Sequence, residues 1–222
     1  MVDIIPAILS TTRSDFHLRF KAVEPYTEWI QIDFVDGRFA PSKTVGPEVI
    51  GQFRTSKKLE IQLMVNFIED WIDPFVKLKP ERIIFPVETA HDPIGIVNHL
   101  RRHRIQVGFS LNTHTEVGRM QHLVDKIDCA VLLAVNPGFQ GQKFYEGVYQ
   151  KIKDLRAMRE DLYIEVDGGQ QPGIARKCAQ AGAKALAVGS YILKNDKIEG
   201  ATYGEKIKNA IDALKEDVKG VS

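Results

Sequence analysis

The sequence predicts an α/β protein of the (β/α)8 or TIM-barrel class, and three observations support that prediction. Eight short apolar runs recur along the chain, and several are apolar at nearly every position, as expected for strands covered on both faces of a parallel sheet. Segments with the helical spacing of apolar residues lie between these runs. No Ser/Gly/Pro-rich linker divides the 222 residues, so we expect a single barrel domain over residues 1–222.

The predicted strands are distributed evenly from the N-terminus to residue 188. An open, doubly wound sheet is the alternative fold, and it is less favoured because it would not usually need eight evenly spaced strands. The predicted strands are Ile4–Leu9, Trp29–Asp33, Leu59–Val65, Arg82–Val87, Gln106–Leu111, Cys129–Val135, Tyr163–Val166 and Ala185–Val188.

Five of the intervening segments carry helix signals. Ser14 could cap the first of them, Asp92 and Pro93 are suited to the start of the second, and Gly182 is suited to the end of the fourth. In each segment, apolar residues or small residues recur on one helical face. The predicted helices are Asp15–Val23, Pro93–Arg102, Tyr149–Arg159, Pro172–Ala181 and Tyr203–Val218.

Composition excludes several classes of protein. Hydrophobic residues make up 44% and charged residues 27%, which is ordinary for a soluble globular chain and excludes a disordered one. The formal net charge of +1 provides no overall field for nucleic acid or an anionic membrane, so we expect neither partner. The apolar runs are far shorter than the roughly 20 residues of a spanning helix. The first residues carry no signal-type pattern, and Cys129 and Cys178 are too few for a disulfide scaffold, so we expect a cytoplasmic protein.

A barrel of this class carries its function at the carboxyl ends of the strands, and glycines gather after the last three. Glycine lets backbone N–H groups approach an oxyanion closely, and the Ser190 hydroxyl could add a donor. We therefore predict a phosphate site there; the alternative is that these glycines only make tight turns. The glycines are Gly138, Gly141, Gly168, Gly169 and Gly189.

Two carboxylates end strands that face each other across the predicted barrel mouth. Asp33 ends the second strand and Asp167 follows the seventh. Such a pair is suited to proton transfer on two sides of a substrate, with one acid and one base. The alternative is that either aspartate caps a helix or pairs with a nearby Lys or Arg.

Six motifs follow one another along the chain: Pro6–Ser10, Asp33–Phe39, Gln62–Val65, Ser110–Asn112, Val135–Phe139 and Glu165–Gly169. In this order they resemble the signatures of the ribulose-phosphate 3-epimerases. The resemblance implies a barrel of the ribulose-phosphate-binding type that inverts a carbon centre of a ketopentose phosphate through an enediolate. It further implies that Asp33 and Asp167 are the acid and base, that Ser10 and Met64 line the reacting end, and that residues 136–143 form a mobile lid. The six glycine and serine positions named above would hold the phosphate.

The sequence departs from that family at the metal site. The resemblance implies a divalent metal held by two histidines and the same two aspartates, but Gln31 and Gln62 stand at the histidine positions. An amide is a poor substitute for imidazole toward zinc or iron, so we expect the metal to be absent or weakly bound. The two amides could instead point at the substrate oxygens, or each could hydrogen-bond its neighbouring aspartate across the emptied position; the sequence leaves both readings open.

We therefore expect an isomerase that acts on ribulose 5-phosphate, xylulose 5-phosphate or a related sugar phosphate. One alternative is a different reaction, such as aldol cleavage or decarboxylation, which is less favoured because Asp33–Asp36 lacks the lysine of an Asp-x-Lys-x-x-Asp arrangement. Another alternative is a non-catalytic sugar-phosphate binder that has lost its metal. The expected partner is a small phosphorylated sugar, and the resemblance leaves a homo-oligomer open.

Overall fold

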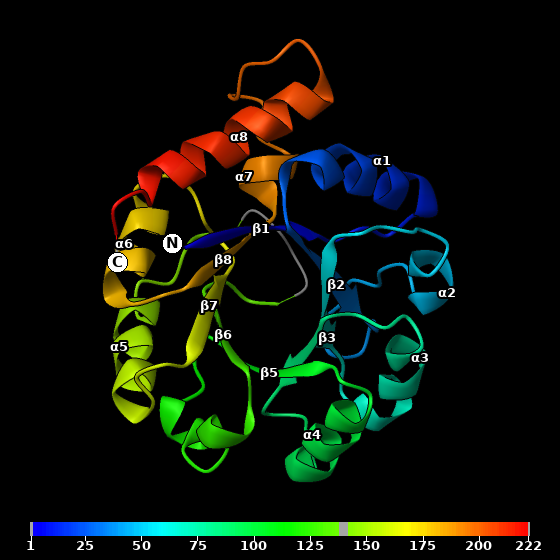
Figure 1. Ribbon diagram of the computed structural model, residues 1–222, viewed down its shortest axis with the longest axis vertical. Helices are drawn as coiled ribbons and strands as arrows, with labels where there is room; N and C mark the ends of the chain where they lie inside the picture. The colour runs from blue at the N-terminus through cyan, green and yellow to red at the C-terminus, as the bar shows by residue number, and fades with distance from the viewer. Residues whose placement is uncertain (1, 138–141, 222) are drawn as a thin grey trace.

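The computed structural model describes residues 2–137 and 142–221, in which eight parallel strands close into a barrel (Figure 1). Each strand pairs with the next in the chain, and β8 pairs with β1 to close the ring. The predicted barrel is thus confirmed, with strand ends that differ from the expected ones by at most two residues. The strands are β1 Asp3–Ile8, β2 Trp29–Val35, β3 Lys58–Met64, β4 Arg82–Pro86, β5 Gln106–Leu111, β6 Cys129–Leu133, β7 Tyr163–Asp167 and β8 Ala185–Val188.

The helices surround the barrel, and all five predicted ones are present (Figure 1). Three short helices, α2, α3 and α7, were not predicted, and only two short 3-10 turns lie between β5 and β6. The α-helices of the described residues are α1 Arg13–Val23, α2 Pro47–Ile50, α3 Ile72–Val76, α4 Pro93–Arg102, α5 Val148–Met158, α6 Ile174–Ala181, α7 Ser190–Leu193 and α8 Tyr203–Asp217.

Two helix starts differ by two residues from the expected ones, for local reasons. The cap of α1 is Thr12, whose side chain accepts from the backbone N–H of Asp15, so the assignment of Ser14 as the cap was wrong. Helix α6 begins at Ile174 because the preceding Gly173 has a φ of 85°, which helical backbone cannot continue. The prediction of Gly182 as the C-cap is confirmed by its left-handed φ of 114°.

Successive strand residues point alternately toward the helices and into the barrel. In β2, Ile30, Ile32 and Phe34 join the large apolar core between strands and helices. Gln31 and Asp33 point the other way and hydrogen-bond each other inside the barrel. The register then places Asp33 beside Gln62 on β3, because these two residues are direct partners in the ladder.

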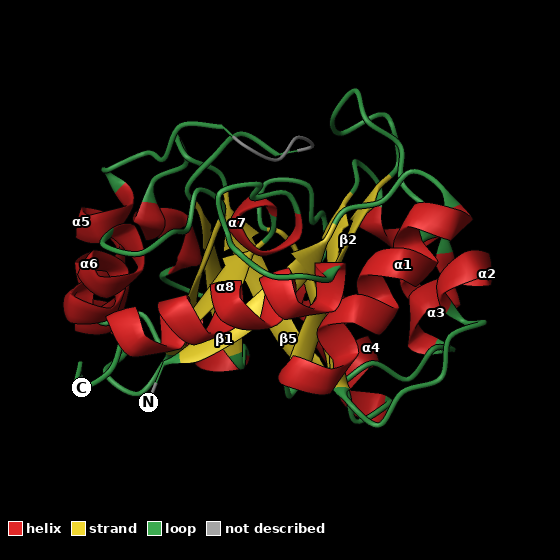
Figure 2. Ribbon diagram, turned by 90° about the horizontal axis from the view of Figure 1, so that it is seen from above, coloured by secondary structure: helices red, strands yellow, loops and turns green. Residues whose placement is uncertain are grey.

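The carboxyl ends of the strands and the loops that follow them share one end of the barrel, and both chain termini lie toward the other (Figure 2). Asp33 near the end of β2 and Asp167 at the end of β7 therefore meet at the same mouth, separated around the ring by β8 and β1. Within the described residues, no helix has the length and apolar character needed to cross a membrane.

Candidate active site

A cavity of about 520 Å³, counting the part open to solvent, lies at the barrel mouth. Its wall combines two carboxylates, an amide and a thioether from β2, β3 and β7 with small residues that follow β7 and β8. The predicted site residues that line it are Asp33, Gln62, Met64, Asp167, Gly168, Gly169, Gly189 and Ser190.

Two other predicted residues, Ser10 and Gln31, do not line this cavity, and two more lie outside the described residues. Ser10 is buried directly after β1, with its hydroxyl lacking a hydrogen-bond partner among the described residues. Gln31 is fully buried, one inward-facing position below Asp33 on the same strand. Gly138 and Gly141, together with the middle of the predicted lid, lie outside the described residues. The roles expected of all four stay predictions.

Asp33 is buried at the mouth and is held by a neighbour on its own strand. Nε2 of Gln31 donates to Oδ1 of Asp33 over 2.7 Å. Burial raises the pKa of the Asp33 carboxyl well above its ordinary value, and the nearby charge of Asp167 raises it further. The Gln31 hydrogen bond opposes this shift without cancelling it. Asp33 therefore favours its protonated form.

Asp167 also accepts a hydrogen bond from a glutamine, but this glutamine lies on the opposite side of the barrel. Nε2 of Gln62 on β3 donates to Oδ2 of Asp167 on β7 over 2.9 Å. Burial raises the pKa of Asp167 from 3.8 to about 6, while the amides of Gln62 and Gln31 oppose the rise. At neutral pH the pair can therefore hold one ionised and one protonated carboxyl, the state in which one group accepts a proton and the other donates one.

The residues at the metal positions do not fit a zinc or iron ion as they are arranged. Both glutamines turn an N–H donor toward a carboxylate, where a metal would need a lone pair. Their Oε1 atoms are buried and have no hydrogen-bond donor among the described residues. Across residues 2–137 and 142–221, no cluster of three or more His, Cys, Asp or Glu side chains could hold a metal ion. Of the two readings that the sequence left open, the structure has each glutamine bonded to an aspartate.

Backbone conformation and close packing both favour glycine at the two positions that follow β7. Gly168 and Gly169 have φ values of 99° and 66°, in the left-handed region that other residues rarely adopt. A Cβ on Gly168 would lie 2.4 Å from Val135, and one on Gly169 would lie 3.0 Å from Phe144. The tight-turn explanation thus accounts for both residues, although they also leave backbone exposed to the cavity.

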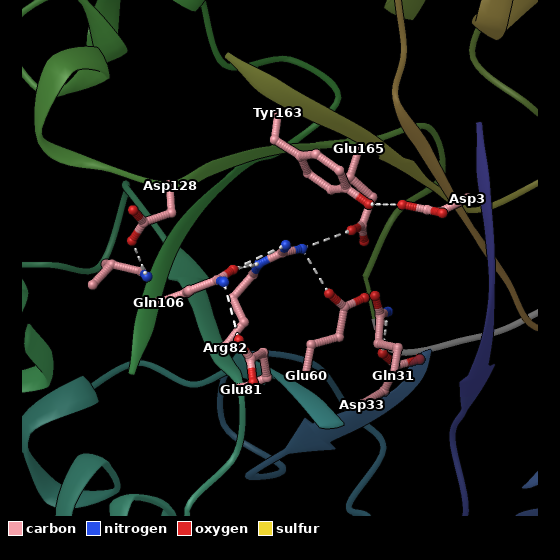
Figure 3. Close-up of polar contacts among 11 residues, drawn as sticks. Asp3, Gln31, Asp33, Glu60, Glu81, Arg82, Gln106, Asp128, Tyr163 and Glu165 are labelled. Carbon is pink, nitrogen blue, oxygen red and sulfur yellow. Dashed lines mark hydrogen bonds and ion pairs between the residues drawn. The ribbon is translucent and has the colours of Figure 1, made fainter. Parts of the chain in front are cut away.

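A charged network that was not predicted from the sequence lies inside the barrel beneath the site (Figure 3). Nη1 of Arg82 lies 2.9 Å from Glu60 and 3.6 Å from Glu165, and the guanidinium packs between the rings of Trp29 and Tyr163. Burial raises the pKa of Glu60 to about 7 and that of Glu165 well above its ordinary value. One arginine thus faces two buried glutamates directly below the aspartate pair.

Alternation along the strands could have identified this network. Glu60 lies two residues before Gln62, and Glu165 two residues before Asp167. Residues two apart on a strand share a face, so both glutamates point into the barrel below the site residues.

Comparison with known proteins gives a consistent picture. The model of the ribulose-phosphate 3 epimerase family matches residues 3–193. A chloroplastic ribulose-5-phosphate-3-epimerase from Arabidopsis thaliana is 36% identical, over 93% of this chain and 75% of its own. A ribulose-phosphate 3-epimerase from Rhodobacter capsulatus is 31% identical, over 93% and 92%. A crystal structure of 3-hexulose-6-phosphate synthase, at 16% identity, superposes with a TM-score of 0.71 over 98% of this chain and 100% of its own, which shows a shared fold.

Proposed function

The chain belongs to the ribulose-phosphate 3-epimerase family, and from that premise we propose that this isomerase interconverts ribulose 5-phosphate and xylulose 5-phosphate, or a closely related pair of ketose phosphates. The two pentulose phosphates differ only in configuration at the carbon next to the carbonyl. Removing the proton from that carbon gives an enediolate, and returning a proton to the opposite face inverts the centre.

The observation that carries this proposal is the pair of acids at one cavity. Asp33 and Asp167 approach the mouth from β2 and β7 and line the same space. In one direction the ionised Asp167 removes the proton and the protonated Asp33 supplies one to the other face. After that turnover Asp33 is ionised and Asp167 protonated, which is the state that the reverse reaction needs. Positioned proton transfer of this kind contributes about 10²–10⁴-fold to rate.

The two glutamines orient the acids in this proposal. Each amide N–H fixes one carboxylate oxygen, so the second oxygen of each group stays available to the substrate. Since the amides do not fit a metal, the proposed reaction uses no divalent ion. The buried pair of aspartates then supplies the proton transfers by itself.

The other end of the substrate would be held by the small residues after β7 and β8. Gly168, Gly169, Gly189 and Ser190 line the cavity together, and the Ser190 hydroxyl can donate to a phosphate oxygen. Backbone N–H groups of a glycine-rich turn add further donors, as in other anion sites. A phosphate held there would leave the ketose carbons to reach toward the aspartates.

The test is conversion of ribulose 5-phosphate to xylulose 5-phosphate, followed by NMR. We expect turnover by the wild-type chain and a loss of about 10²–10⁴-fold in kcat for Asp33→Asn and Asp167→Asn. Asp125→Asn, an exposed aspartate far from the mouth, is the matched control and should keep full activity. Tight binding of sugar phosphates without turnover of any pentulose or hexulose phosphate would instead favour a non-catalytic binder.

A further inference from the structure

A second hollow opens from the phosphate end of the active site. It shares Gly169, Gln170 and Ser190 with the catalytic cavity and continues outward between α6, α7 and residues 142–149. With the solvent at its opening it measures about 1190 Å³, against about 520 Å³ for the catalytic cavity on the same measure. We call this hollow the basic groove.

Its charge distinguishes the basic groove from the rest of the protein. Four lysines line it against a single acidic residue, Glu146, so the lining carries three net positive charges in a chain whose total is +1. The lysines come from three successive segments of the mouth, after β6, on α6 and after α7. They are Lys143, Lys177, Lys194 and Lys197.

These lysines are available to a ligand. All four are exposed, and among the described residues none of their ammonium groups makes an ion pair or hydrogen bond. Unpaired ammonium groups of one sign around a concave surface raise the local concentration of anions, and lysine binds phosphate oxygens as a compact point charge.

We propose that the basic groove is a second anion subsite, which binds an anionic group linked to the phosphate that the active site holds. The chemical class is a diphosphate or phosphodiester at the end of a sugar, carried either by a substrate or by an inhibitor. This proposal rests on the proposed function, because it places the first phosphate beside Gly169 and Ser190. A group attached to that phosphate would enter the groove directly, since the two spaces share these residues.

Calorimetric titration with inorganic phosphate and with inorganic diphosphate tests the groove. We expect the wild-type chain to bind diphosphate at least about ten times more tightly than phosphate, because only diphosphate reaches both subsites. In the variant Lys177→Ala/Lys194→Ala/Lys197→Ala, the affinity for phosphate should change little, while the ratio falls to about three or less. The three exposed side chains are not part of the core, so this variant should fold.

A charge-matched control separates the groove from the protein's overall field. The variant Lys77→Ala/Lys153→Ala/Lys184→Ala removes three exposed lysines elsewhere and should keep the wild-type ratio. Equal affinities for the two anions in the wild-type chain, or an equal fall of the ratio in both triple variants, would overturn the subsite. If phosphate still binds in either of these outcomes, the proposed function stands and only the second subsite is overturned. If the wild-type chain binds neither phosphate nor diphosphate, the second subsite and the proposed function are both overturned.

Discussion

Nε2 of Gln62 on β3 lies 2.9 Å from Oδ2 of Asp167, which stands 105 positions later in the chain on β7. The bond crosses the interior of the barrel and has a counterpart in the 2.7 Å bond from Gln31 to Asp33 on β2. Two amide–carboxylate pairs thus occupy the positions where the family resemblance implies a metal site. Each acid accepts a hydrogen bond from one of these glutamine side chains.

Removing metal should not affect this chain, because no step of the proposed reaction needs it. After dialysis against a chelator, we expect unchanged turnover and well below one zinc per chain by elemental analysis. The variant Gln31→His/Gln62→His restores two imidazoles beside two carboxylates, a donor set that zinc prefers, and should hold about one zinc per chain. Gln121→His/Gln180→His, which alters two exposed glutamines, is the control. One tightly held zinc in the wild-type protein would contradict the account.

Stability should fall as pH rises through the range in which Asp167 ionises. The pKa of this carboxyl is about 6 in the folded chain, against 3.8 for the group when it is not perturbed by the fold. Between these two pH values the folded state therefore binds more protons than the unfolded state. The free energy of unfolding therefore decreases with rising pH in that window. Asp167→Asn should flatten this dependence in urea unfolding measured between about pH 4 and pH 7. Asp125→Asn should leave the slope as it is; a wild-type slope of the opposite sign would show that other groups dominate.

Replacement of Arg82 alone should lower the free energy of unfolding substantially. Arg82→Met leaves Glu60 and Glu165 buried without their cation, and loss of one partner of a buried pair costs about 3–5 kcal/mol. The triple variant Glu60→Gln/Arg82→Met/Glu165→Gln removes the uncompensated charge as well. We expect it to be more stable than Arg82→Met by urea unfolding. A triple variant less stable than Arg82→Met would mean that the charges stabilise the barrel more than their burial costs.

Two glycines with positive φ allow packing at the mouth to be separated from backbone strain. Gly173 has a φ of 85° and open space where a Cβ would point, so Gly173→Ala should cost about 1–3 kcal/mol from backbone conformation alone. Gly168→Ala adds a contact of 2.4 Å with Val135 to a similar φ. We expect it to cost about 1–3 kcal/mol more than Gly173→Ala in thermal or urea unfolding. Equal costs would mean that Val135 moves aside freely.

The sequence predicted the barrel because its signals are local. Continuous apolar runs such as Ile83–Val87 have strand length, and the cap at Asp92 with Pro93 marks the start of α4, which the structure confirms. The convergence of Asp33 and Asp167 also follows from topology, since parallel strands end at one mouth.

Other features depend on tertiary contacts that no local pattern reports. The direction of the Gln62 amide is decided by Asp167, from a strand more than a hundred positions away. The pairing of Arg82 with Glu60 and Glu165 likewise joins β3, β4 and β7 inside the ring. The basic groove is assembled from lysines in three separate segments, each of which looks like an ordinary exposed residue in the sequence.

Solvent exchange in the single aspartate variants tests the central claim, that Asp33 and Asp167 act on opposite faces of one carbon. Each variant is incubated in heavy water with either ribulose 5-phosphate or xylulose 5-phosphate, and deuterium at the epimerised carbon is measured by NMR. We expect each variant to exchange the proton of one epimer only. Asp33→Asn should exchange the proton of one epimer, and Asp167→Asn should exchange the proton of the other. If one variant abolished exchange of both epimers while the other preserved both, a single base would be at work and the two-acid account would be wrong.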